Sequence, residues 1–175
     1  MKRAWPALCC MLLGGCVKYP EPYRPPERRQ PLELREPVRL GHFTAMNSPH
    51  APDHLVSDVL PELHDGAWRW TMQCPTFQFQ LPVTRAMRLL ADITVPDITF
   101  NQTGPVKITV HVSGHPLGTI EVLKPGQLQW EKDVPADWLI TARPVLVRLA
   151  IDKMWTSPDD GTRRGFIITR LGFVQ

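Results

Sequence analysis

The sequence is poor in cysteine and has only a short apolar run at its start. Three of its four cysteines fall within the first sixteen residues, which leaves Cys74 alone in the remaining chain. A disulfide within that remaining chain is therefore excluded. We expect Cys74 to be buried among the apolar residues 68–81, with a reactive thiol as the alternative. The apolar stretch, residues 4–13, is too short for a spanning helix, which needs about 20 residues.

Recognisable catalytic motifs are also missing. There is no Gly-x-Ser-x-Gly nucleophile elbow, no His-Glu-x-x-His zinc motif and no glycine-rich phosphate loop. Most glutamates precede residue 40, which leaves Glu62, Glu121 and Glu131 as candidates for a glycosidase-type carboxylate pair. We therefore predict a protein that is not an enzyme and needs no cofactor. A hydrolase with an unrecognised site is a further alternative.

The charge balance gives no sign of a nucleic-acid partner. The formal net charge is +3 at pH 7, and two of the positive charges, Lys2 and Arg3, belong to the N-terminal segment. Without them the chain is close to neutral, at about +1, whereas nucleic-acid-binding domains carry a strong positive excess. We therefore expect no nucleic acid among the partners.

The N-terminus has the pattern of a secretory signal peptide. Two basic residues precede the apolar residues 4–13, and small residues then precede a cysteine. The sequence Leu13-Gly14-Gly15-Cys16 resembles the bacterial lipobox more than an Ala-x-Ala cleavage site. The resemblance implies cleavage after residue 15, a diacylglyceryl group on the Cys16 thiol and acylation of the new amino terminus. Two or more acyl chains anchor a protein stably in a membrane.

This segment predicts a lipid-anchored location in the cell envelope, and the outer membrane if the organism is Gram-negative. Val17 follows the cysteine at the position where Asp would resemble an inner-membrane retention signal. Cys9 and Cys10 have no small residue immediately before them of the kind that precedes Cys16 and are poorer candidates for lipidation. An ordinary cleaved signal and a buried hydrophobic N-terminus are the alternatives.

Residues 16–40 predict a disordered, Pro-rich tether. Six prolines between residues 17 and 39 are interleaved with arginines and glutamates. Proline removes backbone donors, and mixed charge keeps a segment in water, so neither a helix nor a sheet is favoured. A polyproline II chain of this length reaches roughly 70 Å. A strap packed along the folded module is the alternative.

From Trp68 onward the pattern is that of short strands and turns. Apolar and polar residues alternate over 106–113 and again over 145–152, which is typical of half-buried strands. Further strands are expected at 77–81, 93–95, 119–123, 127–132 and 164–174, with turns at 113–118, 124–126 and 157–161 and one helical turn near 135–139. These elements predict an all-β fold: an antiparallel, jelly-roll-like sandwich over residues 41–175, with its core at about 66–175.

Residues 110–118, 124–126 and 145–152 together carry a resemblance to a known family. They are similar to the galactose-binding-like jelly-roll modules, in which a strand ends in an Asn-Gly type hairpin and a strand after a Pro-Gly turn supplies Val, Ile and Leu. Residues 165–173 resemble the last strand of variants attached to bacterial cell-surface and glycosyltransferase proteins. Ser113 stands where Asn is usual. The resemblance implies a jelly-roll fold over residues 66–175 and says far less about function.

Tryptophans are the candidate ligand-binding residues. Trp68 and Trp70 are two positions apart, so on a strand they share one face, and Trp130 and Trp155 lie near turns. Flat aromatic side chains stack on the C–H faces of sugars, so clustered tryptophans suit a carbohydrate-binding platform. We expect Trp155, beside the turn at 157–161, to be the most exposed. The alternative is that these side chains close the core of a small sandwich.

Two polar clusters suggest metal ligands only weakly. His50 and His54 have the i,i+4 spacing of a metal pair, but Pro52 lies between them and no third ligand is evident, so exposed loop histidines are expected. Three aspartates have the oxygens that Ca²⁺ requires, yet Asp-Asp-Gly is also typical of an ordinary turn. They are Asp152, Asp159 and Asp160. We therefore predict no metal site.

The sequence predicts an envelope lipoprotein that displays a non-catalytic β-sandwich binding module. The membrane is its partner through the lipid on Cys16. The first hypothesis for its ligand is a polysaccharide, which requires an exposed aromatic cluster. The alternative is a structural or assembly lipoprotein that docks onto envelope proteins, which requires an exposed apolar patch or a free sheet edge.

Overall fold

The structure is a computed structural model and describes residues 40–175. The predicted signal peptide, Cys16 and all of the predicted tether except its last residue lie outside the described residues. In the part that is described, no helix is long and apolar enough to cross a membrane. All buried members of the two hydrophobic cores lie between positions 46 and 173, so we expect residues 40–175 to fold by themselves.

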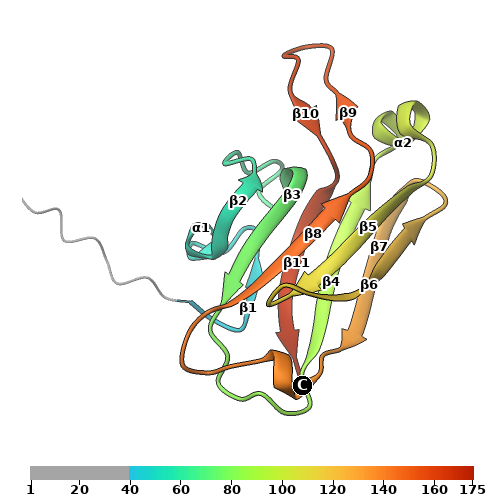
Figure 1. Cartoon of the computed structure of the whole chain (residues 1–175). Helices are drawn as coiled ribbons and strands as arrows, with labels where there is room; N and C mark the ends of the chain where they lie inside the picture. Colours follow the sequence, from blue (N-terminus) through green and yellow to red (C-terminus); the bar gives the residue numbers. More distant parts are fainter. Residues whose placement is uncertain (1–39) are drawn as a thin grey trace, which may run out of the picture. The chain divides into compact units, whose positions relative to one another are not determined.

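The described chain folds mostly into strands (Figure 1). In order, the elements are β1 (Phe43–Ala45), α1 (Ala51–His54), β2 (Leu55–Val59), β3 (Arg69–Phe79), β4 (Arg88–Val95), α2 (Asp97–Thr103), β5 (Val106–Val112), β6 (His115–Val122), β7 (Gly126–Asp133), the 3₁₀ turn η1 (Ala136–Trp138), β8 (Val145–Ile151), β9 (Trp155–Thr156), β10 (Arg163–Arg164) and β11 (Ile167–Val174). The described strands pair antiparallel, so the predicted all-β, antiparallel sandwich is confirmed.

The sandwich has two layers that share the long strand β3. Arg69 and Trp70 of β3 pair with β11, whereas residues 76–79 pair with β8. The order across both layers is β6-β5-β8-β3-β11-β4-β7, with β1 added to β11 and β2 added to β3. β6 and β7 follow one another in the chain but hydrogen-bond to β5 and β4 respectively. β6 and β7, the first and last strands in this order, are therefore joined to each other by a short turn.

Alternation along the strands builds the main core. In β5 the buried positions are Val106, Ile108, Val110 and Val112, as the sequence pattern predicts. Four phenylalanines fill the centre and are fully buried: Phe77, Phe79, Phe166 and Phe173. Burying one such side chain stabilises a fold by about 1.5–3 kcal/mol, so this cluster supplies much of the driving force.

Three regular elements lie where the sequence shows no clear pattern. β1 and β2 are short edge strands before residue 60, and they pair with β11 and β3. α2 begins after Pro96 and ends before Gly104, whose φ of +65° suits glycine. Strands and helices this short carry too few repeats to be recognised from periodicity.

Two local predictions are wrong. Cys74 is only half-buried, because the alternation of β3 turns Pro75, Phe77 and Phe79 inward and leaves Cys74 on the other face. The sequence also predicts one unbroken last strand from residue 164. Instead, β10 pairs with β9 in a separate two-stranded ribbon, and β11 begins at Ile167.

Candidate ligand-binding groove

Three tryptophans gather in a second apolar cluster, separate from the main core. Trp70, Trp155 and Ile167 are its buried members, and the half-buried Trp68 packs against them. The rings of Trp68 and Trp70 meet edge to face with centroids 5.9 Å apart, and those of Trp70 and Trp155 are 6.0 Å apart. The edge-to-face contact of Trp68 with Trp70 is favourable because the positive edge of one ring meets the negative face of the other.

Arg164 completes this cluster. Its guanidinium lies 5.5 Å from the ring centroid of Trp70 and 5.8 Å from that of Trp155, within the range of cation–π attraction. It also forms an ion pair with Asp160 at 2.7 Å. The pKa of Asp160 is lowered, chiefly because its carboxylate accepts a hydrogen bond from the backbone N–H of Thr162. These contacts hold the β9–β10 ribbon against β3.

The prediction that Trp155 is the most exposed tryptophan is wrong. Its side chain is 4% exposed. The turn at 157–161 is the tip of the ribbon, and the ribbon places its first strand against Trp70. Trp70 is buried in the same contact, so neither ring has a free face on which a sugar can stack.

A groove of about 490 Å³ lies beside Trp68. Its floor is a row of residues on neighbouring strands: Ile167 of β11 pairs with Thr94 of β4, which pairs with Gln127 of β7. Residues directly opposite one another across strands share a face of the sheet. Trp68 forms one wall, and Asp97, the first residue of α2, also lines the groove. The other lining residues are Ala67, Pro96, Gly126 and Thr169.

A β-bulge gives Thr169 its place in the groove. Ile168 and Arg170 of β11 pair with Ile93 and Asp92 of β4, and Thr169 between them has no partner on β4. A bulge changes the direction of a side chain and kinks its strand locally. The bulge therefore adds the hydroxyl of Thr169 to the lining of the groove. Regular pairing of β11 with β4 would not be expected to place it there.

The polar side chains of the groove have no hydrogen-bond or ion-pair partner among residues 40–175. They are Thr94, Asp97, Gln127 and Thr169. Trp68, in contrast, is held in place: its ring stacks on His64 with centroids 4.5 Å apart, and its Nε1 donates to the Asp65 carboxylate at 3.2 Å. The groove thus combines a fixed aromatic wall with unengaged donors and acceptors, as small-molecule sites do.

Of the four tryptophans predicted to bind a ligand, Trp68 alone lines this groove. Trp130 is half-buried on β7, packs against the main core and faces Gly118 of β6. Trp138, in η1, stacks on His115 with centroids 4.9 Å apart. The sequence carries no signal for the polar lining residues, because they come together only when β4 pairs with both β7 and β11.

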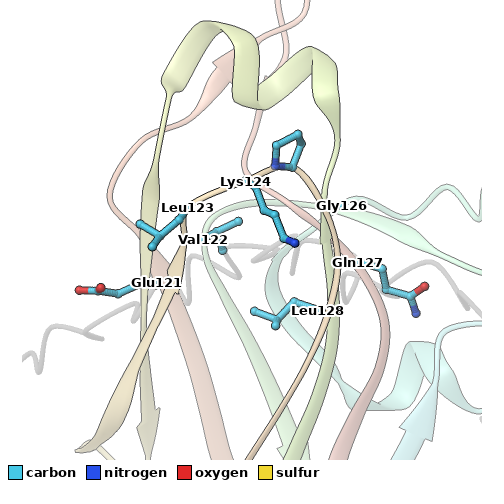
Figure 2. A pocket seen from close by; sticks show the side chains of 8 residues that line it. Glu121, Val122, Leu123, Lys124, Gly126, Gln127 and Leu128 are labelled. Carbon is cyan, nitrogen blue, oxygen red and sulfur yellow. The ribbon is translucent and has the colours of Figure 1, made fainter.

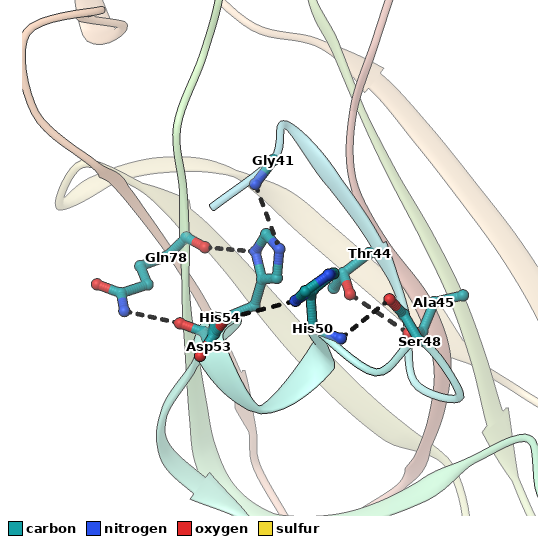
Figure 3. Close-up of polar contacts among 8 residues, drawn as sticks. All are labelled: Gly41, Thr44, Ala45, Ser48, His50, Asp53, His54 and Gln78. Carbon is teal, nitrogen blue, oxygen red and sulfur yellow. Dashed lines mark hydrogen bonds and ion pairs between the residues drawn. The ribbon is translucent and has the colours of Figure 1, made fainter. Parts of the chain in front are cut away.

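His50 and His54 do not form a metal pair (Figure 3). His54 is buried: its Nδ1 donates to the backbone oxygen of Gln78 at 2.8 Å, and its Nε2 accepts from the backbone N–H of Gly41 at 3.4 Å. Burial lowers the pKa of His54 below its ordinary value. His50 is exposed, 3.8 Å from the Asp53 carboxylate. The expectation of exposed loop histidines therefore holds for His50 and is wrong for His54.

Two of the three aspartates considered for Ca²⁺ are engaged in contacts within the protein. Asp152 accepts a hydrogen bond from the backbone N–H of Lys107 at 2.8 Å, and Asp160 is bound to Thr162 and Arg164. Within residues 40–175, no group of three or more His, Cys, Asp or Glu side chains is arranged to hold a metal ion.

Comparison with known proteins assigns no relative: no family model matches the sequence, and no curated protein is significantly similar to it.

Proposed function

We propose that this protein is an envelope lipoprotein, anchored by lipid at Cys16, whose sandwich binds carbohydrate in the groove beside Trp68. The groove itself carries the proposal. Sugar rings present apolar C–H faces next to hydroxyls, so they match an aromatic wall beside hydroxyl, amide and carboxylate groups.

The charge of the groove narrows the class of polysaccharide. Asp97 is its one ionisable side chain, and no lysine or arginine lines it. A carboxylate accepts hydrogen bonds from sugar hydroxyls but repels uronic acids and sulfates. Gln127 supplies both a donor and an acceptor. We therefore expect a neutral polysaccharide rather than an acidic one.

The groove lies at the opposite end of β4 from the point where the described chain begins. The backbone N–H of Phe173 donates to the carbonyl oxygen of His42, and Phe173 pairs with Leu89 near the start of β4. The groove is at Thr94, about 17 Å further along at 3.4 Å per residue. The groove and the point where the described chain begins are therefore at opposite ends of β4.

Binding of residues 40–175 to a polysaccharide panel tests the ligand class. The panel contains neutral galactan, mannan and β-glucan, with alginate as the acidic member. We expect saturable binding to at least one neutral polymer and a loss of at least tenfold in affinity for Trp68→Ala. Trp138→Ala is the matched control, because Trp138 also stacks on a histidine but lies outside the groove. Equal losses in both variants, or no binding across the panel, contradict the proposal.

Labelling with radioactive palmitate tests the anchor. Full-length protein is expressed in bacteria, and the label and the membrane fraction are followed. We expect Cys16→Ala to lose both the label and the membrane association, and Cys10→Ala to keep them. Label that persists in Cys16→Ala rules out lipidation at this position.

A docking lipoprotein is the second candidate, and one observation favours it. Among residues 40–175, β7 pairs only with β4 and most of its side chains are exposed, so no described strand pairs with its outer edge. A free edge can accept a strand from a partner protein. A photo-crosslinker at Gln129 of β7 that captures one defined envelope protein in cells, while the same group at Leu146 of the central strand β8 captures none, supports docking.

A further inference from the structure

The turn that joins β6 to β7 borders a second pocket, of about 420 Å³ (Figure 2). Its lining consists of residues 121–128. Because β6 hydrogen-bonds to β5 and β7 to β4, the two strands lead into different layers and leave this corner of the sandwich open. Val122 belongs to the main core and Leu128 packs against it, so the pocket reaches from solvent to the edge of the core.

The wall of this pocket is aliphatic. Val122, Leu123, Pro125 and Leu128 contribute it, and no aromatic side chain is among the lining residues. Leu123 is 73% exposed, more than any other large apolar residue of the described chain. A hydrocarbon chain that covers Leu123 removes this apolar surface from water, which is favourable.

Lys124 contributes the one positive charge among the residues that line this pocket. In the view of Figure 2, the ammonium group of Lys124 points toward the space between Val122 and Leu128. Within residues 40–175 it has no ion-pair or hydrogen-bond partner. Glu121, the one acidic residue of the lining, pairs instead with Lys107 at 2.8 Å. The pocket therefore attracts an anion.

We propose that this pocket binds a single-chain anionic amphiphile of the fatty-acid type. Its hydrocarbon chain contacts Leu123 and Leu128, and its carboxylate pairs with Lys124. An aliphatic wall suits a flexible chain better than a planar ring, and a lone lysine acts as a point charge for one anionic group. The volume is within the 300–1,000 Å³ that is typical of ligand sites. A recess lined by residues 121–128 alone has room for a single chain, which favours a free amphiphile over a bilayer surface.

This pocket is distinct from the groove beside Trp68, and the proposal is independent of carbohydrate binding. Gly126 and Gln127 border both cavities. Successive side chains of a strand point to opposite faces, and in Figure 2 Gln127 points away from Leu128. The pocket therefore lies on the core side of β7, and the groove lies on the outer face of β7.

NMR titration of residues 40–175 with monomeric decanoate tests the site. We expect saturable shifts of backbone amides confined to residues 121–128, and at least tenfold weaker binding of the uncharged decanol. Lys124→Glu is expected to bind decanoate at least tenfold more weakly than the wild-type chain does. The variant is also expected to bind decyltrimethylammonium at least tenfold more tightly than the wild-type chain does. A misfolded variant does not gain a new ligand at the same residues, so this exchange separates charge recognition from loss of structure.

Two control variants complete the test. Arg143→Glu reverses a charge at a smaller apolar depression beside Leu146, and we expect it to leave decanoate binding unchanged. Trp68→Ala is also expected to leave decanoate binding unchanged, because Trp68 lines the groove and not this pocket. Failure of the carbohydrate proposal therefore leaves the amphiphile proposal standing. The proposal is overturned by an absence of saturable shifts, by shifts outside residues 121–128, by unaltered decanoate binding in Lys124→Glu, or by shifts that only phosphatidylglycerol vesicles produce.

Discussion

Arg170 of β11 forms an ion pair with Asp92 of β4, and Asp92 is the one carboxylate that is buried in the described part of the chain. Asp92 is 2% exposed, whereas half of the Arg170 side chain remains in solvent. The bulge at Thr169 sets the register that places the two residues opposite one another. The pair therefore joins two of the strands that form the floor of the groove.

This pair predicts an asymmetric effect of mutation. Arg170→Ala leaves a buried carboxylate without its partner, and we expect it to lower the free energy of unfolding by about 3 kcal/mol. Asp92→Asn leaves a half-exposed guanidinium that water can solvate, so a loss of about 1 kcal/mol is expected. Urea denaturation measures both. Arg88→Ala, which removes the exposed pair with Glu131, is the control and is expected to cost at most about 1 kcal/mol. Equal losses for Arg170→Ala and Arg88→Ala refute this view of the buried pair.

His54 predicts a pH-dependent stability. Its pKa in the folded state is lowered by burial, so the unfolded chain takes up a proton near pH 6.5 while the folded chain does not. The stabilisation from neutral His54 is therefore complete above pH 6.5 and is lost as the pH falls below it. Urea denaturation between pH 5 and 7.5 is expected to show a shallower slope for His54→Gln than for wild type. His50→Gln, at the exposed neighbour, is expected to keep the wild-type slope, and a shallower slope there as well argues against a specific role of His54.

Gly165 predicts a packing constraint between β10 and β11. A Cβ atom at this position lies 2.6 Å from the carbonyl oxygen of Met72 and 3.1 Å from Cγ2 of Ile151. Gly165→Ala is therefore expected to lower the free energy of unfolding by about 2 kcal/mol. At Gly41 the nearest contact of an added Cβ is 3.4 Å, so Gly41→Ala is expected to change stability by less than about 0.5 kcal/mol. Thermal denaturation of both variants gives the comparison.

At Ser113, we expect one substitution to raise the thermal stability of the protein. Val112 pairs with His115, and both turn residues between them have positive φ: +51° for Ser113 and +87° for Gly114. This backbone favours Asn-Gly, because Asn tolerates the left-handed region better than Ser. Ser113→Asn is expected to raise Tm by about 2–4 °C. Ser113→Val, which is β-branched, is expected to lower it, and an equal rise in both excludes turn conformation as the cause.

The strands with the clearest alternation are the ones that sequence analysis predicts best. Val106 to Val112 and Val145 to Ile151 form β5 and β8, because a strand with one buried face repeats every two residues wherever it lies. The turn at 124–126 and the helical turn η1 are likewise local, since Pro and Gly restrict or free the backbone at their own positions. β1 and β2 depend on the strands that they join, so their short patterns do not reveal them.

The burial of the tryptophans shows the limit of local pattern. A position beside a turn favours exposure, yet Trp155 is buried because the β9–β10 ribbon folds onto Trp70 and Arg164 covers both rings. The signal for this contact is spread over Trp70, Trp155 and Arg164, which are distant in the sequence or on opposite strands of the ribbon.

The sequence by itself determined the class of fold, the absence of a disulfide after residue 16 and the pattern on which the lipid-anchor proposal depends, because each follows from residue types at short, regular spacings. The tertiary structure decided which side chains meet. Thr94, Gln127 and Ile167 form one row only after β4 has paired with β7 and β11. That pairing joins distant segments whose register depends on how the whole sandwich buries its core, so no single segment encodes the groove.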